Sequence, residues 1–335
     1  MKYKLRLLSS IFACLTFSSV GYAKTGYGEH LEGFEYPYPL QYFNFSSQQE
    51  NLKMGYMDIQ PDHPNGKTVV VLHGKNFCAA TWEGTIKFLT QEGYRVIAPD
   101  QIGFCTSSKP AHYQYSFQQL ALNTHNLLNK LDIHNPILLA HSTGGMLATR
   151  YALMYPKQTK LLAMVNPIGL EDWKAKGVPY RSIDQWYQRE LNLTYDSIKS
   201  HELKTYYQGV WKPEYDKWVD MLAGLNAGEG HEKVAWNSAL IYDMIFTQPV
   251  YYEFPNIKVP TVLFIGTDDT TAIGSDIAPP EVKQNIGQYR VLGKEAAKRI
   301  HHAELIEFED MGHAPQMQNQ KLFHRALIKV LNKSE

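Results

Sequence analysis

Short hydrophobic runs alternate with longer amphipathic segments along most of this chain. The first of these runs is rich in β-branched residues and is typical of a strand buried on both faces, and the others repeat the signal of a strand. The runs lie at 67–73, 95–98, 136–140, 161–165, 261–265 and 304–308. Several segments between and after them repeat hydrophobic residues at helical spacing. These predict helices that begin near residue 82 and that cover 117–131, 145–155 and 321–331.

Two stretches before the first run, 42–45 and 52–56, mix apolar and polar residues and predict two antiparallel strands. Together with the six buried strands they give an α/β fold, a mostly parallel sheet of eight strands with helices on both faces. Such a sheet places its ligand site outside the carboxyl ends of the strands. The residues that directly follow each strand are therefore the candidates for chemistry.

Residues 170–254 interrupt this alternation. They contain five of the six tryptophans and nine tyrosines, and they predict polar, aromatic helices without a strand. We interpret them as a helical lid inserted into one catalytic domain, which consists of residues 24–169 and 255–335. Most of the aromatic rings are expected to form the lid's own core, and a few to line an apolar pocket. The candidates for the pocket are Trp173, Trp186, Trp211 and Trp236.

The first 23 residues have the pattern of a cleaved export signal. Lys2, Lys4 and Arg6 precede an apolar stretch at 7–20, and small residues end the segment. That stretch is shorter than the roughly 20 residues of a membrane-spanning helix, so a permanent anchor is the weaker interpretation. Lipidation at Cys14 is a second alternative. We expect a periplasmic or secreted protein without a stable membrane anchor.

The charge balance bears on possible partners. The 335 residues include 33 Lys+Arg and 33 Asp+Glu, and removal of the leader would leave a slightly acidic chain. A nucleic-acid-binding protein normally has a basic excess. We therefore expect a small-molecule substrate and no nucleic acid. The sequence gives no indication of the oligomeric state.

A serine occupies the turn between the strand at 136–140 and the helix after it. The segment Ala140-His141-Ser142-Thr143-Gly144-Gly145 surrounds it with small residues, which suit a strained turn where strand and helix backbones pass close together. It resembles the nucleophile elbow of the α/β-hydrolase family, G-x-S-x-G, with Ala140 in place of the first glycine. This resemblance makes Ser142 the candidate nucleophile.

Four other segments resemble motifs of the same family, in the order that it requires. They are Leu72-His73-Gly74-Lys75-Asn76, Ala98-Pro99-Asp100-Gln101-Ile102-Gly103-Phe104, Gly266-Thr267-Asp268-Asp269 and Asp310-Met311-Gly312-His313. The resemblance covers about residues 40–332. It implies an oxyanion hole formed by the backbone N–H groups of Lys75 and Thr143. It also implies a catalytic triad of Ser142, Asp269 and His313.

The chemistry of these residues supports the same roles. A serine hydroxyl becomes nucleophilic when a neighbouring base takes its proton, and a histidine titrates near neutrality. An imidazole that becomes cationic needs a carboxylate beside it. Asp269 is favoured because it lies three residues after Gly266, whereas Asp268 is the nearest alternative and Asp172 a remoter one.

Other polar residues receive simpler interpretations. His141 is expected to pack beneath the site, and the Lys75 side chain to face solvent or the lid. His301 and His302, adjacent at the start of a strand, would point to opposite faces and could not share a metal ion. The sequence contains no glycine-rich phosphate loop and no cluster of metal ligands. We therefore expect no metal and no cofactor.

Two cysteines remain after removal of the leader. Cys78 follows the predicted oxyanion loop, and Cys105 lies in the loop after the next strand. Neighbouring strands would bring these loops to one rim of the sheet, where a disulfide could form in an oxidising compartment. Two free thiols are the alternative.

The resemblance implies a serine hydrolase that cleaves a carboxylic ester or a lactone through an acyl-enzyme. A serine at 142 argues against epoxide hydrolases and haloalkane dehalogenases, the capped relatives with an aspartate nucleophile. Amide, thioester and carbon–carbon bond hydrolysis and acyl transfer use the same triad and stay open. An aminopeptidase would need a lid carboxylate, for which Glu202, Glu214 and Asp216 are available. A non-catalytic small-molecule receptor on the same fold is the remaining alternative.

Overall fold

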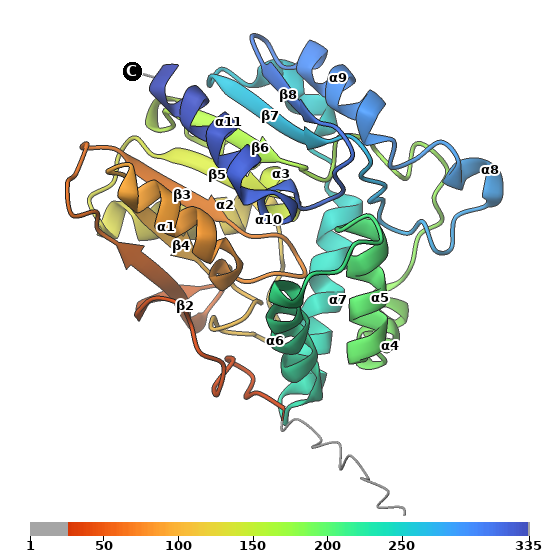
Figure 1. Cartoon of the computed structure of the whole chain (residues 1–335). Coiled ribbons are helices and arrows are strands. Elements are labelled where there is room, and N and C mark those ends of the chain that lie inside the picture. The colour runs from red at the N-terminus through yellow and green to blue at the C-terminus, as the bar shows by residue number, and fades with distance from the viewer. Residues whose placement is uncertain (1–25, 334–335) are drawn as a thin grey trace, which may run out of the picture.

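The computed structural model describes residues 26–333, so the predicted export signal and Cys14 lie outside the described residues. Eight strands form one mostly parallel sheet, as predicted, and their order is β1-β2-β4-β3-β5-β6-β7-β8 (Figure 1). They are β1 (Leu40–Ser47), β2 (Glu50–Ile59), β3 (Thr68–Leu72), β4 (Arg95–Pro99), β5 (Ile137–His141), β6 (Leu161–Val165), β7 (Thr261–Gly266) and β8 (Glu304–Phe308). β2 pairs antiparallel with β1 and β4, and all other neighbours are parallel.

Helices cover both faces of this sheet because its central strands have apolar side chains on both sides. The helices outside the insertion are α1 (Glu83–Gln91), α2 (Phe117–Lys130), α3 (Thr143–Met154), α8 (Pro280–Lys283), α9 (Tyr289–Arg299), α10 (Pro315–Gln318) and α11 (Gln320–Lys333). In β3, Val69 and Val71 belong to the core beneath α1 and α11, while Val70 and Leu72 belong to the core beneath α2, α3 and α9. The alternation explains why the sequence of β3 is hydrophobic without interruption.

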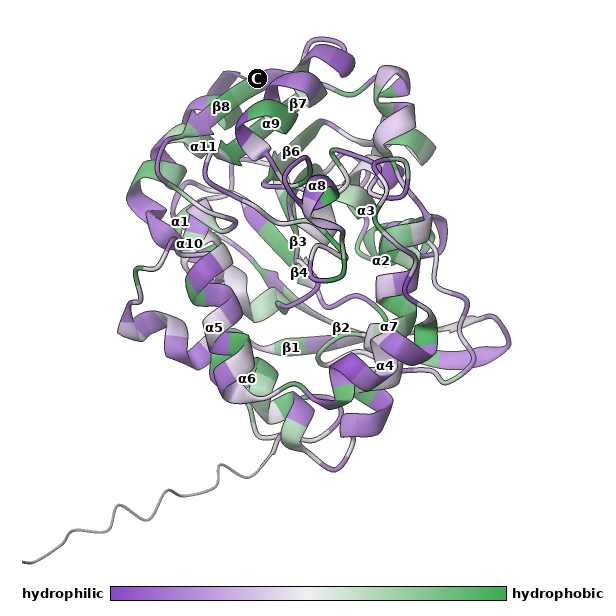
Figure 2. Ribbon diagram, turned by 90° about the vertical axis from the view of Figure 1, so that its right-hand side faces the viewer, coloured by the Kyte–Doolittle hydropathy of each residue, from purple (hydrophilic) through white to green (hydrophobic). Residues whose placement is uncertain are grey.

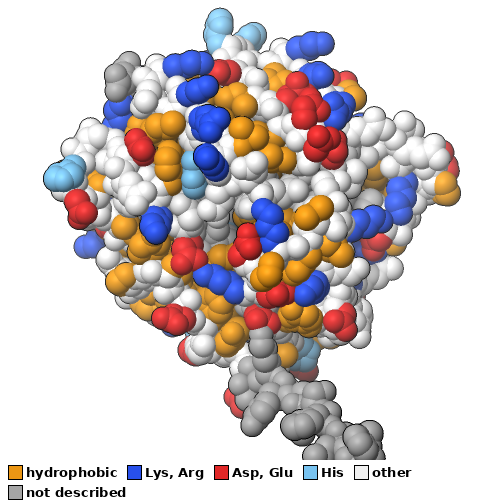
Figure 3. Space-filling model, viewed as in Figure 1, with side chains coloured by type: hydrophobic (Ala, Val, Ile, Leu, Met, Phe, Trp, Pro, Cys, Tyr) orange, Lys and Arg blue, Asp and Glu red, His pale blue; other side chains and the backbone are white. Residues whose placement is uncertain are grey.

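The outer surface is polar. Figure 2 shows hydrophobic strands inside the molecule and hydrophilic outward faces on the helices that surround them. On the face drawn in Figure 3, acidic and basic side chains are interspersed, in keeping with their equal numbers in the chain. None of the helices within residues 26–333 is long and apolar enough to cross a membrane.

Four helices stand between β6 and β7, inside the segment where the sequence predicted a helical insertion. They are α4 (Ile183–Leu191), α5 (Tyr195–Thr205), α6 (Asp216–Ala227) and α7 (His231–Thr247). Capping boxes at Ser182 and Thr194 begin α4 and α5 by satisfying N–H groups of the first turn. Figure 1 shows these helices grouped on one side of the sheet. We call residues 170–254 the helical insertion.

Buried polar contacts fasten the helical insertion to the sheet domain. The ammonium group of Lys75 lies 2.5 Å from a carboxylate oxygen of Glu190 in α4, and the two side chains are only 11% and 1% exposed. Burial alone would raise the pKa of Glu190, but the charges of Lys75 and Arg189 lower it below its ordinary value. Breaking a buried pair leaves an uncompensated charge, so this contact resists separation of the insertion from the loop after β3.

A disulfide joins the loop after β3 to the loop after β4. Cys78 and Cys105 are bonded, with their Cα atoms 5.9 Å apart. The carboxylate of Asp100 lies beside the bond and accepts hydrogen bonds from the backbone N–H of Ala79, at 2.8 Å, and of Thr106, at 3.2 Å. Ala79 directly follows Cys78 in the chain, and Thr106 directly follows Cys105. The two loops are therefore tied twice, once covalently and once through Asp100.

The structure differs from the sequence prediction at two histidines. His301 and His302 were expected at the start of a strand, but β8 begins only at Glu304. Both side chains are exposed in the turn after α9, where His302 has a φ of 60°. The turn, rather than the alternation of a strand, separates their side chains.

Loss of the disulfide should lower stability and leave the fold intact. The bond closes a loop with a sequence separation of 27, so its absence should reduce the free energy of unfolding by about 3 kcal/mol through greater freedom of the unfolded chain. Thermal unfolding of the mature protein, with and without reductant, checks this for the pair of substitutions Cys78→Ser and Cys105→Ser. A melting temperature that reductant leaves unchanged, or two titratable thiols in the unfolded, unreduced protein, would contradict the assignment.

Candidate active site

Ser142 lies on a strained turn between β5 and α3. Its φ of 56° and ψ of −122° fall in a region that non-glycine residues rarely adopt. Close approach of neighbouring backbones surrounds the turn. A side chain at Gly144 would come 2.5 Å from the carbonyl oxygen of Leu72, and one at Gly74 would come 2.9 Å from the Cβ of Ser142. Both glycines therefore allow the loop after β3 to lie against the serine.

The three residues that sequence analysis selected are brought together here. The Oγ of Ser142 lies 2.8 Å from Nε2 of His313, and Nδ1 of His313 lies 2.6 Å from a carboxylate oxygen of Asp269. The side chains of His313 and Asp269 are almost fully buried, at 1% and 0% exposure. This chain of hydrogen bonds can move a proton from the hydroxyl to the imidazole while the carboxylate stabilises the resulting cation.

The carboxylate of Asp269 is held by three further hydrogen bonds. One oxygen accepts from the backbone N–H and the hydroxyl of Thr271, at 2.8 and 2.7 Å, and the other accepts from the amide of Asn166 at 2.9 Å. The alternative acids point elsewhere. Asp268 binds Arg290, and Asp172 accepts a hydrogen bond from the hydroxyl of Tyr252.

Sequence reasoning missed Asn166. It directly follows β6, has a φ of 37°, and bonds the backbone of Gly266 as well as Asp269. A polar residue directly after a buried strand was the available signal, because the site lies at the carboxyl ends of the strands.

The backbone of His313 is anchored from below and from the helical insertion. The imidazole of His141 lies 2.8 Å from the His313 carbonyl oxygen, to which its Nε2–H donates. Burial, followed by the neighbouring His313, lowers the pKa of His141 well below its usual range, so this ring is neutral. The N–H of His313 donates to the carbonyl of Thr205 at 3.2 Å, and the ring of Tyr206 packs 4.9 Å from the imidazole. His141 thus lies beneath the site, as the sequence predicted.

The proposed oxyanion donors are available. Within residues 26–333, the backbone N–H groups of Lys75 and Thr143 donate no hydrogen bond to the protein. The loop that carries Lys75 is held by His73, whose Nδ1–H donates to the Gly74 carbonyl at 2.8 Å while Nε2 accepts from the N–H of Gln101 at 3.1 Å. Burial lowers the pKa of His73, so the neutral ring can act as donor and acceptor at once.

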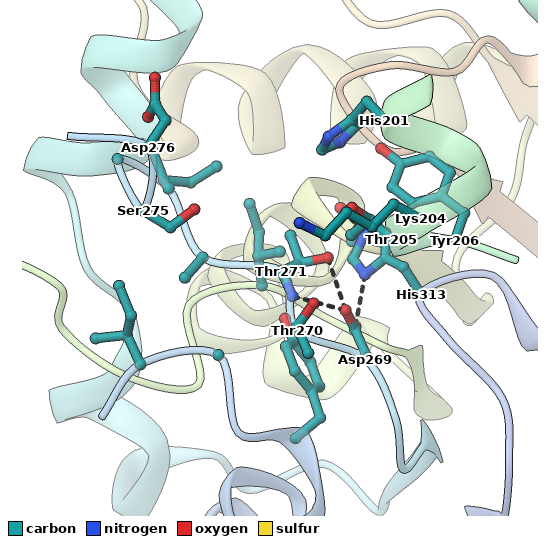
Figure 4. Close-up of a pocket in the computed structure, with 18 of the residues that line it drawn as sticks. His201, Lys204, Thr205, Tyr206, Asp269, Thr270, Thr271, Ser275, Asp276 and His313 are labelled. Atoms are coloured by element: carbon teal, nitrogen blue, oxygen red, sulfur yellow. Dashed lines mark hydrogen bonds and ion pairs between the residues drawn. The ribbon is translucent and has the colours of Figure 1, made fainter. Parts of the chain in front are cut away.

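A cavity of about 640 Å³ opens above the serine, which is the size of a small-molecule site. Figure 4 shows it between α5 and the loop after β7, with His313 and Asp269 at its floor. Of the four tryptophans predicted to line the pocket, Trp186 does so, stacked 4.2 Å from the ring of Tyr242.

The prediction is wrong for the other three tryptophans. The indole N–H of Trp173 donates to Glu171 in the core, that of Trp211 donates to Asp216, and that of Trp236 donates to the carbonyl of Ala111. None of the three borders the cavity around Ser142. Trp173 and Trp211 lie in connecting segments and only Trp236 lies in a helix, α7, so the packing of segments distant in sequence, rather than local spacing, decides where each ring lies.

The carboxylates considered for an aminopeptidase do not line this cavity. Both carboxyl oxygens of Glu202 are buried and accept no hydrogen bond within the described residues. Glu214 is exposed on the outer surface, and Asp216 is occupied by Lys199 and Trp211. No one of them is placed to bind an amino group beside Ser142.

Within residues 26–333, one group of side chains has the composition of a metal site, but these side chains already bond to other atoms of the protein. Cys78, Asp100 and Cys105 lie within 4.8 Å of one another. The two sulfur atoms are bonded to each other, and Asp100 holds the N–H groups of Ala79 and Thr106. These three residues hold the loops after β3 and β4 together and are therefore not free to bind a metal ion.

The fold and the comparison with known proteins define the class. Residues 67–320 match the family model of the α/β hydrolase fold, and the chain belongs to this family. It is an enzyme of the α/β-hydrolase class.

Particular relatives are similar over much of the chain. A probable hydrolytic enzyme from Pseudomonas aeruginosa PAO1, known from a crystal structure, is 58% identical with a TM-score of 0.90, covering 91% of this chain and 98% of that one. Lipase 1 of Psychrobacter immobilis is 30% identical over 68% of this chain and 65% of its own length. A non-heme chloroperoxidase of Kitasatospora aureofaciens is 25% identical over 81% of this chain and 94% of its own length.

The buried carboxyl of Glu202 should make stability depend on pH. Burial raises its pKa from the ordinary 4.5 to about 8, so the folded state holds the proton more tightly than the unfolded state. The contribution of this group to stability therefore falls as the pH rises from about 4.5 to about 8. Glu202→Gln should match the wild type near pH 5 and exceed its free energy of unfolding by roughly 2–4 kcal/mol at pH 8.

Denaturant unfolding at pH 5, 6.5 and 8 measures this difference. Glu214→Gln is the matched control, because that carboxylate is exposed. Its difference from the wild type should not change with pH. A difference for Glu202→Gln that is equally independent of pH would contradict the raised pKa.

Proposed function

We propose that this protein is an exported serine hydrolase that cleaves a carboxylic ester or a lactone. The observation that carries the proposal is the hydrogen-bonded chain from Ser142 through His313 to Asp269 at the floor of the cavity. Two unoccupied backbone donors, those of Lys75 and Thr143, belong to the segments on either side of the serine. A protein that only binds a ligand has no need for both features.

In the first half of the reaction, His313 takes the proton of Ser142 as Oγ attacks the carbonyl carbon. The negative charge that develops on the substrate oxygen is stabilised by the N–H groups of Lys75 and Thr143, which interact with it most strongly in the transition state. His313 then gives its proton to the departing alkoxide, and the acyl group stays on Ser142.

In the second half, His313 accepts a proton from water, and the resulting hydroxide attacks the acyl carbon. The proton returns to Oγ of Ser142 as the carboxylic acid leaves. The carboxylate of Asp269 accepts the hydrogen bond of Nδ1 and stabilises the cationic ring. The cavity above the serine provides room for the acyl group and for the water.

Three observations favour ester or lactone hydrolysis over other reactions. The serine at position 142 replaces the aspartate of epoxide hydrolases and haloalkane dehalogenases, and the 30% identical relative from Psychrobacter immobilis is a lipase. Against aminopeptidase activity, the acidic side chains that do line the cavity, Asp268, Asp269 and Asp276, are already bonded to His313 or to arginines. Amide, thioester or carbon–carbon bond hydrolysis and acyl transfer to an alcohol are the alternatives on the same triad.

Export rests on the leader-like pattern of residues 1–23 and on the Cys78–Cys105 bond. Disulfides persist in oxidising compartments and are rare in the cytosol. We therefore place the enzyme in the periplasm or outside the cell.

Removal of the proposed nucleophile should abolish ester hydrolysis. In a panel of chromogenic esters of increasing acyl length and small lactones, Ser142→Ala should lower kcat by at least about 10⁴-fold, because no other group forms the acyl-enzyme. The control is Ser46→Ala, which removes an exposed hydroxyl outside the cavity and should change kcat less than about threefold. Rates near background for the wild type across the whole panel would contradict ester and lactone hydrolysis and favour the alternatives.

The two neighbouring aspartates provide a paired test. Asp269→Asn should lower kcat by about 10⁴-fold, because the amide cannot stabilise a cationic His313 and favours the wrong tautomer. Asp268→Asn weakens surface contacts to Arg290 and to the hydroxyl of Thr267 and should change kcat less than about threefold. Steady-state kinetics on the best ester of the panel measure both. Equal effects at the two positions would contradict the assignment of Asp269.

A further inference from the structure

The cavity around Ser142 contains more basic than acidic side chains. Its basic residues are Lys75, Arg189, Lys204, Lys283 and Arg290, and its acidic residues are Asp268, Asp269 and Asp276. A concave site whose walls have a low dielectric constant concentrates the electric field of this excess positive charge on a ligand inside it. The excess matters only if some of the positive groups are without acidic partners.

Each acidic group of the lining already has a partner. Asp269 binds His313, and Asp268 lies 3.1 Å from Arg290. Asp276 lies 2.7 Å from Arg181, at the start of the helical insertion. None of the three is left to neutralise a further positive charge in the cavity.

The basic groups fall into two sets. Lys75 and Arg189 share the buried carboxylate of Glu190, and Arg290 binds Asp268 and Glu309. Within residues 26–333, the side chains of Lys204 and Lys283 form no ion pair and no hydrogen bond. These two ammonium groups are therefore available to a ligand.

Lys204 is the better placed of the two. Figure 4 shows its side chain extending from the last turn of α5 into the cavity, toward Thr271 and the loop that carries Ser275. The next residue, Thr205, accepts the backbone hydrogen bond of His313, so Lys204 is anchored one residue from a contact with the proposed base. Lys204, Ser142 and His313 thus line one cavity, and the backbone next to Lys204 is fixed by the proposed base.

Other side chains around Lys204 can also donate hydrogen bonds to an anion. One of them, a histidine, also responds to the positive charge in the cavity. The hydroxyl groups of Thr270 and Ser275 line the opposite wall. His201, one turn before Lys204 on α5, opens onto the same cavity. Desolvation by the protein around this ring and then the positive charge of Arg189 lower the pKa of His201, which leaves the ring neutral and able to donate one hydrogen bond.

We propose that the substrate carries an anionic oxygen group, a carboxylate or a phosphate, in addition to its ester or lactone carbonyl, and that the ammonium group of Lys204 binds it. The inference rests on the proposed hydrolase activity and narrows its substrate class. Lys283 lies at the end of α8 on the rim of the cavity and assists capture. An uncharged substrate would leave both ammonium groups without a partner.

The test compares three p-nitrophenyl esters of similar shape. The acyl group is adipate with a terminal carboxylate, 5-phosphonopentanoate with a terminal phosphonate, or 6-methylheptanoate with an uncharged branched end. For the wild type, Lys204→Gln and Lys204→Arg, the ratio of kcat/KM for each charged ester to that for the uncharged ester is measured. Lys204→Gln should lower this ratio about five- to tenfold, as expected for a charge-assisted hydrogen bond in a partly open cavity, and Lys204→Arg should retain most of it.

Lys199→Gln is the matched control. Lys199 belongs to the same helix, but its ammonium group binds Asp216 and does not line the cavity. Its substitution should leave the ratio unchanged. A fall for the carboxylate ester alone, or for the phosphonate ester alone, identifies which anion the site takes and supports the proposal.

Binding without turnover separates this inference from the proposed reaction. In the Ser142→Ala background, calorimetry with butyl hydrogen adipate should show affinity that Lys204→Gln weakens about five- to tenfold. Intact, Lys204-dependent binding with no hydrolysis of any ester by the wild type would overturn the proposed function and keep the anion site. An unchanged ratio and unchanged binding in Lys204→Gln, with or without a lower melting temperature, would overturn the anion site and leave Lys204 as a cation that complements the end of α5.

Discussion

Strand β5 turns into helix α3 within one residue, and the backbone of that residue, Ser142, is the constraint on which the rest of the site depends. A φ of 56° costs on the order of 1–3 kcal/mol, and it persists because the surroundings determine it. The N–H of Ser142 donates to the carbonyl of Val165, and its carbonyl accepts from the N–H of Ile168. Gly74 and Gly144 allow the neighbouring loop and strand to close around the turn. The position of Oγ, and of the donors beside it, follows from this packing.

The other parts of the site are held to the same turn from different directions. His141, the residue before the serine, fixes the backbone of His313, while Asn166, at the end of the adjacent strand, fixes Asp269. The helical insertion contributes as well, since Thr205 binds the N–H of His313 and Glu190 binds the side chain of Lys75. The insertion is thus part of the framework that positions the proposed base and the proposed oxyanion loop, in addition to forming a wall of the cavity.

Local sequence patterns were sufficient to predict the sheet and the three central residues. The small residues around Ser142, and the short segments that end at Asp269 and His313, report constraints that act within a few positions along the chain. The strand at 67–73 was predictable because a strand buried on both faces must be hydrophobic throughout.

The remaining features depend on packing between segments that are distant in sequence. Trp186, in α4, lines the cavity, whereas Trp211, in the segment between α5 and α6, donates its indole N–H to Asp216 instead, because tertiary packing sets the position of each. The roles of Asn166 and Lys204 depend on contacts and orientations that arise only after β6, β7 and α5 have come together. The local sequence around an aromatic or charged residue in a helix does not show which surface its side chain will face.

Both halves of the proposed reaction depend on Ser142 as an activated nucleophile. The most direct measurement is to treat the native mature protein with a fluorophosphonate probe and to locate the adduct by peptide mass spectrometry. We expect one adduct per chain, on the peptide that contains Ser142, and no adduct in Ser142→Ala or in heat-unfolded protein. An unlabelled native protein, or an adduct that persists on another residue in Ser142→Ala, would contradict this role of Ser142.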